Sequence, residues 1–459
     1  MAPDGGGGGA GGGSEDAEVI AAAFGQELSF MAAQLYSLWH KFLGLLIYCP
    51  REMATLLRQK FERRLVDRLG ESLFRDPIKT RDVSQAFDRE IWDTHSRMAD
   101  ALRRSASYIE KPPLPIEDVA VASHHELHPI LFEQTYEPTD GEEGPSQKAP
   151  SFAVSAAASG AGGEGGRRAA SSSMAGAGAE GDSTLELPCA PKRYQGVHLF
   201  VLVHGFQGNS YDMRLLKSHL TLLFPELIVH SSTANEDATE GCIGGMGELL
   251  AKEVRQFVKD WAPGGSLSRL SFVAHSLGGL IVRAALPHLK DLWEHLYLFM
   301  TLSSPHLGYM YNSNKLVDAG MWVLKTWRRS LCLQQLSMTD AKEPRDCFIY
   351  KLSKEQGLSE FKFVALVSSW QDNYAPFDSA RIEVSSKAAQ DAKFGPVFTQ
   401  MAKNLLGKVN PRRLIRFDVN YKIPEKNLDT FIGRAAHIQF LENQVLMRML
   451  LHCYAPLFK

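Results

Sequence analysis

A serine at a predicted tight turn is the first residue whose type and surroundings suit it for chemistry. Ser276 lies between an apolar stretch at 270–274, typical of a buried strand, and a second apolar stretch at helical spacing. Small residues on either side, Ala274 and Gly278, let such a turn project the hydroxyl above the end of the strand, where it can act as a nucleophile. An ordinary strand-turn-helix connection with a capping serine would look the same, so the hypothesis depends on partner residues elsewhere.

A carboxylate and a base are the partners that a serine nucleophile needs. The hydroxyl is weakly nucleophilic at neutral pH until a base takes its proton, and the base is oriented by a carboxylate. In sheets of this type the acid precedes the base along the chain, and both follow the serine. Asp372 is the first carboxylate after the apolar stretch at 361–367 and is the predicted acid. Asp378 is the competing candidate, and Asp372 could also be a simple turn-forming residue.

The predicted base is His437. The segment 414–423 alternates apolar and polar residues, as a last, half-exposed strand does, and His437 follows it on a predicted loop that contains small residues. A carboxy-terminal helix is predicted over 438–451. His275 lies directly beside the nucleophile and His452 at a helix end, so neither is well aimed at the serine.

Backbone N–H groups near the serine are predicted to stabilise the transition state. Attack on an ester carbonyl places negative charge on its oxygen, which two N–H donors in a water-poor pocket can hold. The loop after the apolar stretch Val197–Val203 carries Gly205, Phe206 and Gln207. The N–H groups of Phe206 and Leu277 are the predicted pair, with Gln207 as a weaker substitute for Phe206. A plain strand-to-helix turn is the other interpretation of this loop.

The elements that must position these residues alternate between strands and helices from residue 192 to the end. Strands are predicted at Val197–Val203, 227–230, 270–274, 297–302, 361–367 and 414–423, and helices at 246–261, 277–289 and 438–451. This alternation predicts an α/β fold, with a mostly parallel sheet covered by helices on both faces. Working side chains in such sheets gather at the carboxyl ends of the strands, which is where each candidate lies.

Five sequence blocks together resemble one family. They are His204, Gly205 and Phe206; the serine turn at 274–279; the segment 301–308; the segment 372–379; and Ala435, Ala436 and His437. In this order they resemble the lipase-like serine esterase family of the α/β-hydrolase superfamily. The resemblance covers somewhat more than half of the chain. It implies the α/β-hydrolase fold, hydrolysis of carboxylic esters, and a triad of Ser276, Asp372 and His437. Ala274 departs from the usual glycine, but some lipases carry alanine there.

The rest of the 459-residue chain is predicted to divide into three parts. Residues 1–14, which include a glycine tract, are read as a disordered leader. Residues 15–137 are read as a helical region, because apolar residues recur at three-to-four spacing over most of it. The Gly-, Ala- and Ser-rich residues 138–191 cannot bury enough apolar surface to order themselves, and are read as a flexible linker before the hydrolase domain at 192–459.

Two segments have both a functional and a structural interpretation. The helix predicted after Pro50 carries several basic residues, among them Arg58, Arg63 and Arg64. They suggest contact with a membrane surface or a partner, although a solvated helix face is the simpler interpretation. The apolar segment 309–336 could form a lid over the site or an amphipathic helix packed on the sheet. His306 is expected to be structural.

Composition excludes several classes of protein. A formal net charge of −2 gives no basic footprint for nucleic acid, and the six cysteines form no CxxC pair, so no zinc site is expected. Scattered cysteines indicate reduced thiols and a cytoplasmic location. The glycine-rich segment 241–247 lacks the lysine of a phosphate loop, so no nucleotide or other cofactor is expected. The apolar run at 42–49 is much shorter than the roughly 20 residues of a membrane span.

These observations predict a carboxylic ester hydrolase that acts through an acyl-enzyme. A lipid or another hydrophobic ester is the expected substrate, on the strength of the resemblance. The competing hypothesis is a hydrolase-like binding or scaffold module that works chiefly through its helical amino-terminal region, because a fold alone does not establish catalysis. Protein partners and oligomeric state are not indicated by the sequence.

Overall fold

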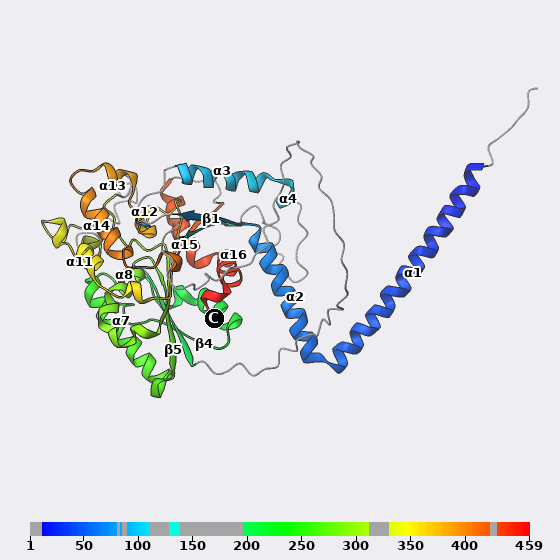
Figure 1. Ribbon diagram of the computed structural model, residues 1–459, viewed down its shortest axis with the longest axis horizontal. Coiled ribbons are helices and arrows are strands. Elements are labelled where there is room, and N and C mark those ends of the chain that lie inside the picture. Colours follow the sequence, from blue (N-terminus) through cyan, green and yellow to red (C-terminus); the bar gives the residue numbers. More distant parts are fainter. Residues whose placement is uncertain are drawn as a thin grey trace, which may run out of the picture. The chain divides into compact units, whose positions relative to one another are not determined.

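The computed structural model describes residues 12–79, 83–84, 90–109, 128–137, 196–311, 330–422 and 429–459. The chain divides into two compact units, Met1–Leu65 and Val66–Lys459. The described part of the first unit consists of helix α1 (Gly12–Tyr48) and most of helix α2 (Pro50–Gly70) (Figure 1). Pro50 opens α2 because a proline lacks the N–H that the first turn leaves unbonded. The predicted leader lies outside the described residues except for 12–14, and the predicted linker lies outside them entirely.

An eight-stranded sheet forms the centre of the second unit, in the order β1-β2-β8-β7-β6-β5-β3-β4. The strands are β1 (Leu73–Lys79), β2 (Ile130–Glu137), β3 (Val197–Val203), β4 (Leu227–Ser231), β5 (Leu267–His275), β6 (Leu296–Leu302), β7 (Phe363–Ser368) and β8 (Leu414–Asn420). All neighbouring pairs are parallel except β2 with β8, which is antiparallel. The resulting architecture is the α/β-hydrolase fold that the sequence predicted.

Helices lie on both sides of this sheet (Figure 1). They are α3 (Glu90–Arg104), α4 (Ala106–Ile109), α6 (Arg214–Leu223), α7 (Ile243–Trp261), α8 (Gly278–Ala285), α10 (Leu331–Leu336), α11 (Phe348–Lys354), α12 (Phe377–Arg381), α13 (Ser386–Gln390), α14 (Gly395–Leu406), α15 (Asp429–Glu442) and α16 (Gln444–Arg448). Side chains of α7, α8 and α14 pack with those of β3, β5 and β6 in one large apolar cluster. Burial of such clusters is the dominant favourable term in folding, so this core fixes the strand ends that carry the site.

The six strands predicted from the sequence are all present, with bounds that differ by three residues or fewer. One expectation about exposure was wrong. Segment 414–423 was expected to be a half-exposed last strand, but all of β8 is buried and it lies inside the sheet. The reason is that β2 pairs with its outer edge, from a part of the chain far away in sequence.

Two strands of the sheet come from the amino-terminal region that was predicted as helical. That region does contain helices α1 to α4, but β1 and β2 lie between and after them. β1 carries Arg75, Asp76 and Pro77, which are poor strand residues. Proline is tolerated because β1 is the edge strand, where one side of the strand needs no hydrogen-bond donors.

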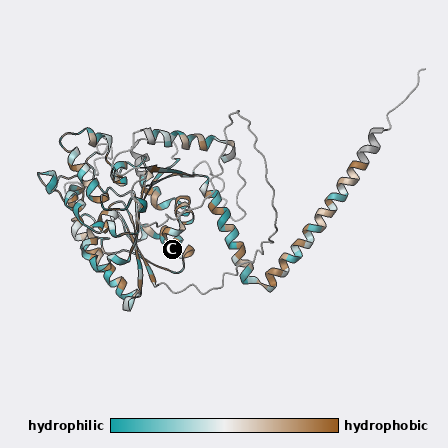
Figure 2. Cartoon of the chain, in the orientation of Figure 1, coloured by the Kyte–Doolittle hydropathy of each residue, from teal (hydrophilic) through white to brown (hydrophobic). Residues whose placement is uncertain are grey.

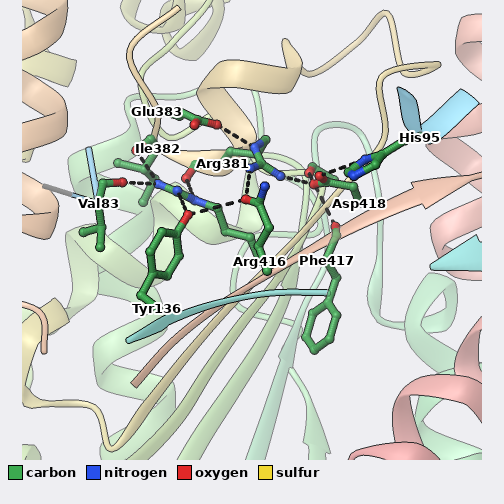
Figure 3. Close-up of polar contacts among 11 residues, drawn as sticks. Val83, His95, Tyr136, Arg381, Ile382, Glu383, Arg416, Phe417 and Asp418 are labelled. Carbon is green, nitrogen blue, oxygen red and sulfur yellow. Dashed lines mark hydrogen bonds and ion pairs between the residues drawn. The ribbon is translucent and has the colours of Figure 1, made fainter. Parts of the chain in front are cut away.

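A buried network of charged and polar side chains joins β2 to the rest of the sheet (Figure 3). Its buried members are Gln134, Tyr136, Arg381, Glu383, Arg416 and Asp418. Arg381 bridges Glu383, Asp418 and the side chain of Gln134. Arg416 bonds the hydroxyl of Tyr136 and the carbonyl oxygen of Val83. Because breaking a buried ionic network is strongly destabilising, we expect β2 to unfold together with β8 and α12.

The helices of the described residues include none that combines the length and the apolarity needed to cross a membrane. Five cysteines are described, at positions 49, 242, 332, 347 and 453, and all are free thiols. The cytoplasmic location stays a prediction.

Candidate active site

Ser276 stands on a strained turn between β5 and α8. Its backbone φ is +52°, in the left-handed region that non-glycine residues rarely adopt. The turn is held because the Ser276 N–H donates to the carbonyl of Leu302 on neighbouring β6, at 3.0 Å. Gly278 allows close packing, since a Cβ there would lie 2.6 Å from the carbonyl oxygen of Val203. Such a strained serine at the carboxyl end of a central strand is the arrangement that the sequence predicted for a nucleophile.

The serine turn tolerates Ala274, which replaces the glycine that the usual motif has at this position. It is fully buried within β5 and keeps regular parallel register with Val203 on one side and Thr301 on the other. Its methyl group is part of the apolar cluster, so the turn two residues later is unaffected.

His437 and Asp372, the predicted base and acid, are in contact. His437 Nδ1 lies 2.6 Å from Asp372 Oδ2. A carboxylate only accepts, so Nδ1 carries the proton and Nε2 is left as a basic nitrogen. Asp372 is 4% exposed, and the ring of Tyr374 stacks on the His437 ring with 5.4 Å between centroids. The competing acid, Asp378, lies in the first turn of α12.

His437 lies inside helix α15, and not on the predicted loop. The helix begins eight residues earlier, at Asp429. The loop was predicted because the residues before His437 are small. Two of them, Ala435 and Ala436, are strong helix formers and belong to the helix. The consequence is that the imidazole projects from a regular element, which holds it more firmly than a loop would.

The carboxylate of Asp372 accepts four hydrogen bonds. Besides His437 they come from the backbone N–H groups of Tyr374 (2.7 Å) and Ala375 (3.2 Å), and from the hydroxyl of Ser303. Ser303 was not anticipated as a site residue. It also has a positive φ of +52°, which directs its side chain from the end of β6 toward the acid. The carboxylate is therefore fixed in place and solvated by protein donors.

A glutamine clamps the loop that carries the acid. The side chain of Gln371 both donates to the carbonyl of Tyr421 and accepts from its N–H, each at 2.7 Å. The Tyr421 ring in turn contacts Phe440 of α15, with 5.5 Å between centroids. Burial raises the pKa of Tyr421 well above its ordinary value, so this residue stays neutral beside the acid. The acid loop and the helix of the base are thus tied to the same end of β8.

The residue before Ser276 contacts this acid–base pair. The ring of the adjacent His275 packs on the ring of His437 with centroids 4.6 Å apart, and its Nε2 lies 3.3 Å from the His437 carbonyl oxygen. Burial, together with the nearby His437, lowers the pKa of His275 well below its ordinary value, so this side chain is neutral. Among the described residues, the Ser276 hydroxyl forms no hydrogen bond to His437. Catalytic hydrogen bonds are often long without substrate and shorten in the complex.

The predicted oxyanion loop lies against the serine. A Cβ on Gly205 would be 2.9 Å from the Cβ of Ser276, so only glycine fits. Gln207, the weaker candidate donor, has a φ of +51° and gives its N–H to Thr239 Oγ1 at 2.9 Å. Within the described part of the chain, the N–H groups of Phe206 and Leu277 have no acceptor. These two N–H groups stay the predicted oxyanion donors.

His306 is structural in its surroundings, as expected. It is fully buried, its Nε2 pairs with the hydroxyl of Thr301 at 3.1 Å, and its carbonyl accepts from Arg283. Burial lowers the pKa of His306 well below its ordinary value. This histidine is therefore neutral and removed from solvent.

Most of the predicted lid segment, 312–329, lies outside the described residues. On its far side, Leu331 N–H donates to the carbonyl of Glu240 and the Cys332 thiol to that of Thr239. The chain that leaves the segment is thus attached next to the oxyanion loop. In the described ranges, no three His, Cys, Asp or Glu side chains gather as metal ligands do.

Part of the chain is similar to known proteins. Residues 193–387 match the family described as "Putative serine esterase (DUF676)". That stretch lies within the second unit. It contains Ser276 and Asp372 and ends before His437. The match is thus a similarity of part of the second unit to this family.

Curated relatives are also similar to part of the chain. "Putative lipase YDL109C" of Saccharomyces cerevisiae is 28% identical over 179 residues, which are 36% of this chain and 26% of that protein. "Putative lipase C4A8.10" of Schizosaccharomyces pombe is 27% identical over 227 residues, which are 45% of this chain and 28% of that protein. The match thus spans about a quarter of the length of these relatives.

Two solved structures are also similar. Bacillus licheniformis lipase BlEst2 has a TM-score of 0.29 and 18% identity, covering 56% of this chain and 94% of that one. Aspergillus fumigatus lipase B has a TM-score of 0.31 and 16% identity, covering 56% of this chain and 63% of that one.

Proposed function

We propose that the protein hydrolyses carboxylic esters through an acyl-enzyme on Ser276, with His437 as base and Asp372 as its orienting acid. The observation that carries the proposal is the 2.6 Å contact between His437 Nδ1 and Asp372. It lies beside a serine whose strained backbone and position at the end of β5 are those of a nucleophile. The family match supports the reaction class.

The first half of the reaction forms the acyl-enzyme. Nε2 of His437 takes the hydroxyl proton as Oγ of Ser276 bonds to the ester carbonyl carbon. The N–H groups of Phe206 and Leu277 hold the resulting oxyanion. The imidazolium, stabilised by Asp372, then passes its proton to the alkoxide, and the alcohol leaves.

The second half releases the acid. A water molecule gives a proton to Nε2 of His437 while its oxygen attacks the acyl carbon, and the same two N–H groups hold the second oxyanion. Collapse of this intermediate breaks the bond to Ser276 Oγ, which recovers the proton from the imidazolium. Four hydrogen-bond donors hold the Asp372 carboxylate beside the imidazole throughout.

A lipid or other hydrophobic ester is the proposed substrate. The curated relatives bear the name of lipases, and this is the support for the substrate class. A panel of p-nitrophenyl esters of increasing acyl length, followed by acylglycerols and phospholipids, tests it. The proposal expects kcat/KM to rise with acyl length, and preference for acetate over every longer chain would contradict it.

Site-directed variants of the full chain test the reaction itself. Ser276→Ala removes the nucleophile and is expected to lower kcat by more than about a thousandfold. Ser353→Ala is the control, because this buried serine bonds only within and beside α11, at Tyr350 and Asn404. It should keep wild-type turnover. If neither wild type nor control hydrolyses any ester of the panel, the hydrolase-like binding module becomes the better description.

A further inference from the structure

Helix α1 carries a long apolar seam on its surface. Its residues are Phe24, Leu28, Met31, Leu35, Leu38, Phe42 and Leu45, spaced alternately by four and three. In this seam Phe24 is 64%, Met31 53% and Leu35 69% exposed. Figure 2 shows apolar residues recurring along the length of the helix. An alternating four-three repeat is the pattern that places every apolar side chain toward a second helix in a two-stranded coil.

The residues that flank the seam identify the partner. Between Val19 and Pro50 the helix has only two charged residues of the Asp, Glu, Lys and Arg classes, Glu27 and Lys41, and they lie fourteen positions apart on the same flank. On the other flank lie Gly25 and Trp39, also fourteen apart. One flank therefore carries two residues of opposite charge, Glu27 and Lys41. The other flank carries a residue without a side chain and a residue with a large ring, Gly25 and Trp39.

We infer that α1 pairs with α1 of a second copy of this chain, in antiparallel orientation. In an antiparallel pair of identical helices, the residue numbers of two facing residues always add up to the same value, and this value defines the register. In the register where facing seam residues add up to 66, Phe24 packs on Phe42, Leu28 on Leu38, and Met31 on Leu35. Each of these contacts occurs twice in the dimer. In this register, the numbers of facing residues on the flank with the two charges add up to 68. Glu27 of each copy therefore lies opposite Lys41 of the other copy.

The same register matches side chains by size. On the other flank, the numbers of facing residues add up to 64. Trp39 of each copy therefore lies over Gly25 of the other copy, and the two Ala32 residues meet at the centre of the dimer. A large ring is thus opposite a residue that has no side chain. Sliding the helices by one heptad loses both matches, because Glu27 then faces Gln34 or Tyr48. The pairing is isologous and closed, so it stops at a dimer.

Other occupants fit the helix less well. Two parallel copies would bring Glu27 beside Ala32, Lys41 beside Leu46, and Trp39 beside Gln34, so that both charges would lack a partner. A lipid surface requires an apolar face but no charge register along the helix. The self-complementary spacing of Glu27 and Lys41 is explained only by an antiparallel copy.

Charge reversal in the full chain tests the orientation. Sedimentation velocity over a concentration series should show a dimer for the wild type. Glu27→Lys and Lys41→Glu each replace two attractions by two repulsions, and the dissociation constant should rise about tenfold or more. The double variant restores both attractions and should return to the wild-type value. Gln26→Lys adds a positive charge away from the seam and should leave the dissociation constant unchanged.

A mixture of the two single variants gives the most discriminating test. In an antiparallel heterodimer of Glu27→Lys with Lys41→Glu, both charge pairs are attractive, so the mixture should associate more tightly than either variant alone. A mixture no tighter than its components would overturn the inference. So would a wild-type chain that is monomeric at every concentration, whether it stays in solution or floats with phosphatidylcholine vesicles. Circular dichroism of each variant confirms that α1 is retained.

Discussion

Thr239 offers a test of how the oxyanion loop is held. Its Oγ1 accepts the N–H of Gln207 at 2.9 Å, and the residue is 4% exposed. Gln207 has a φ of +51°, a conformation that costs a non-glycine residue of the order of 1 kcal/mol and that persists only when neighbouring contacts enforce it. The bond to Thr239 is one of these contacts, and we expect it to hold in place the preceding residue, Phe206, whose N–H is a predicted oxyanion donor.

Thr239→Val keeps the shape of the side chain but removes the acceptor. The lost hydrogen bond is worth roughly 0.5–1.5 kcal/mol, which is comparable with the backbone strain, so the loop relaxes. Complete loss of one oxyanion donor costs about 2.7–4 kcal/mol of transition-state stabilisation. A donor that is displaced and not removed should cost less, so we expect kcat to fall by about ten- to a hundredfold. KM should change little, because the bond to the oxyanion forms in the transition state.

Steady-state hydrolysis of a p-nitrophenyl ester measures this effect. Thr239→Ser retains the hydroxyl and should keep kcat within about threefold of the wild type. Thermal unfolding of both variants separates a catalytic defect from loss of the fold. A valine variant with wild-type kcat, or a serine variant as impaired as the valine one, would refute the assigned role of Thr239.

Three other perturbations follow from the structure. Ser303→Ala removes one of four donors to Asp372 and should lower kcat about five- to thirtyfold, whereas an unchanged kcat would show that the other donors suffice. Arg416→Met breaks the buried network around β2 and should lower the free energy of unfolding by about 3–5 kcal/mol in urea titration; a loss below about 1 kcal/mol would contradict a cooperative role. Burial, and to a smaller extent the charge of Arg269, lower the pKa of His198 from 6.5 to about 3. Between pH 6.5 and 3 the unfolded chain therefore binds a proton that the folded protein does not. The free energy of unfolding should fall as the pH drops through this range. His198→Phe should flatten this dependence in acid titration, and an equal slope in both proteins would be inconsistent with a buried neutral imidazole.

Much of the structure after residue 192 could be predicted from the sequence. Each buried strand is a short apolar stretch with few polar interruptions, and Phe206, Ser276 and Asp372 each follow such a stretch within a few residues. Burial on both faces of a parallel sheet produces that signal locally, so no knowledge of strand order was needed. The contact of Asp372 with His437 is the product of this arrangement.

Features that depend on distant pairing could not be read in the same way. β1 and β2 have weak strand signals, and their place in the sheet is decided by partners such as Arg416, which lies 280 residues after Tyr136. Ser303 resembles any other serine until its positive φ aims it at Asp372. The helix around His437 was missed because alanines are compatible with a small-residue loop as well as with a helix.

Mapping of a covalent adduct tests the central claim most directly. A fluorophosphonate reacts with an activated serine and stays attached, so the labelled full chain can be digested and the modified peptide identified by mass spectrometry. The account predicts one adduct per chain, on Ser276, that is absent from Ser276→Ala and forms far more slowly in His437→Ala. An adduct on another residue, or no adduct on the folded wild-type protein, would contradict it.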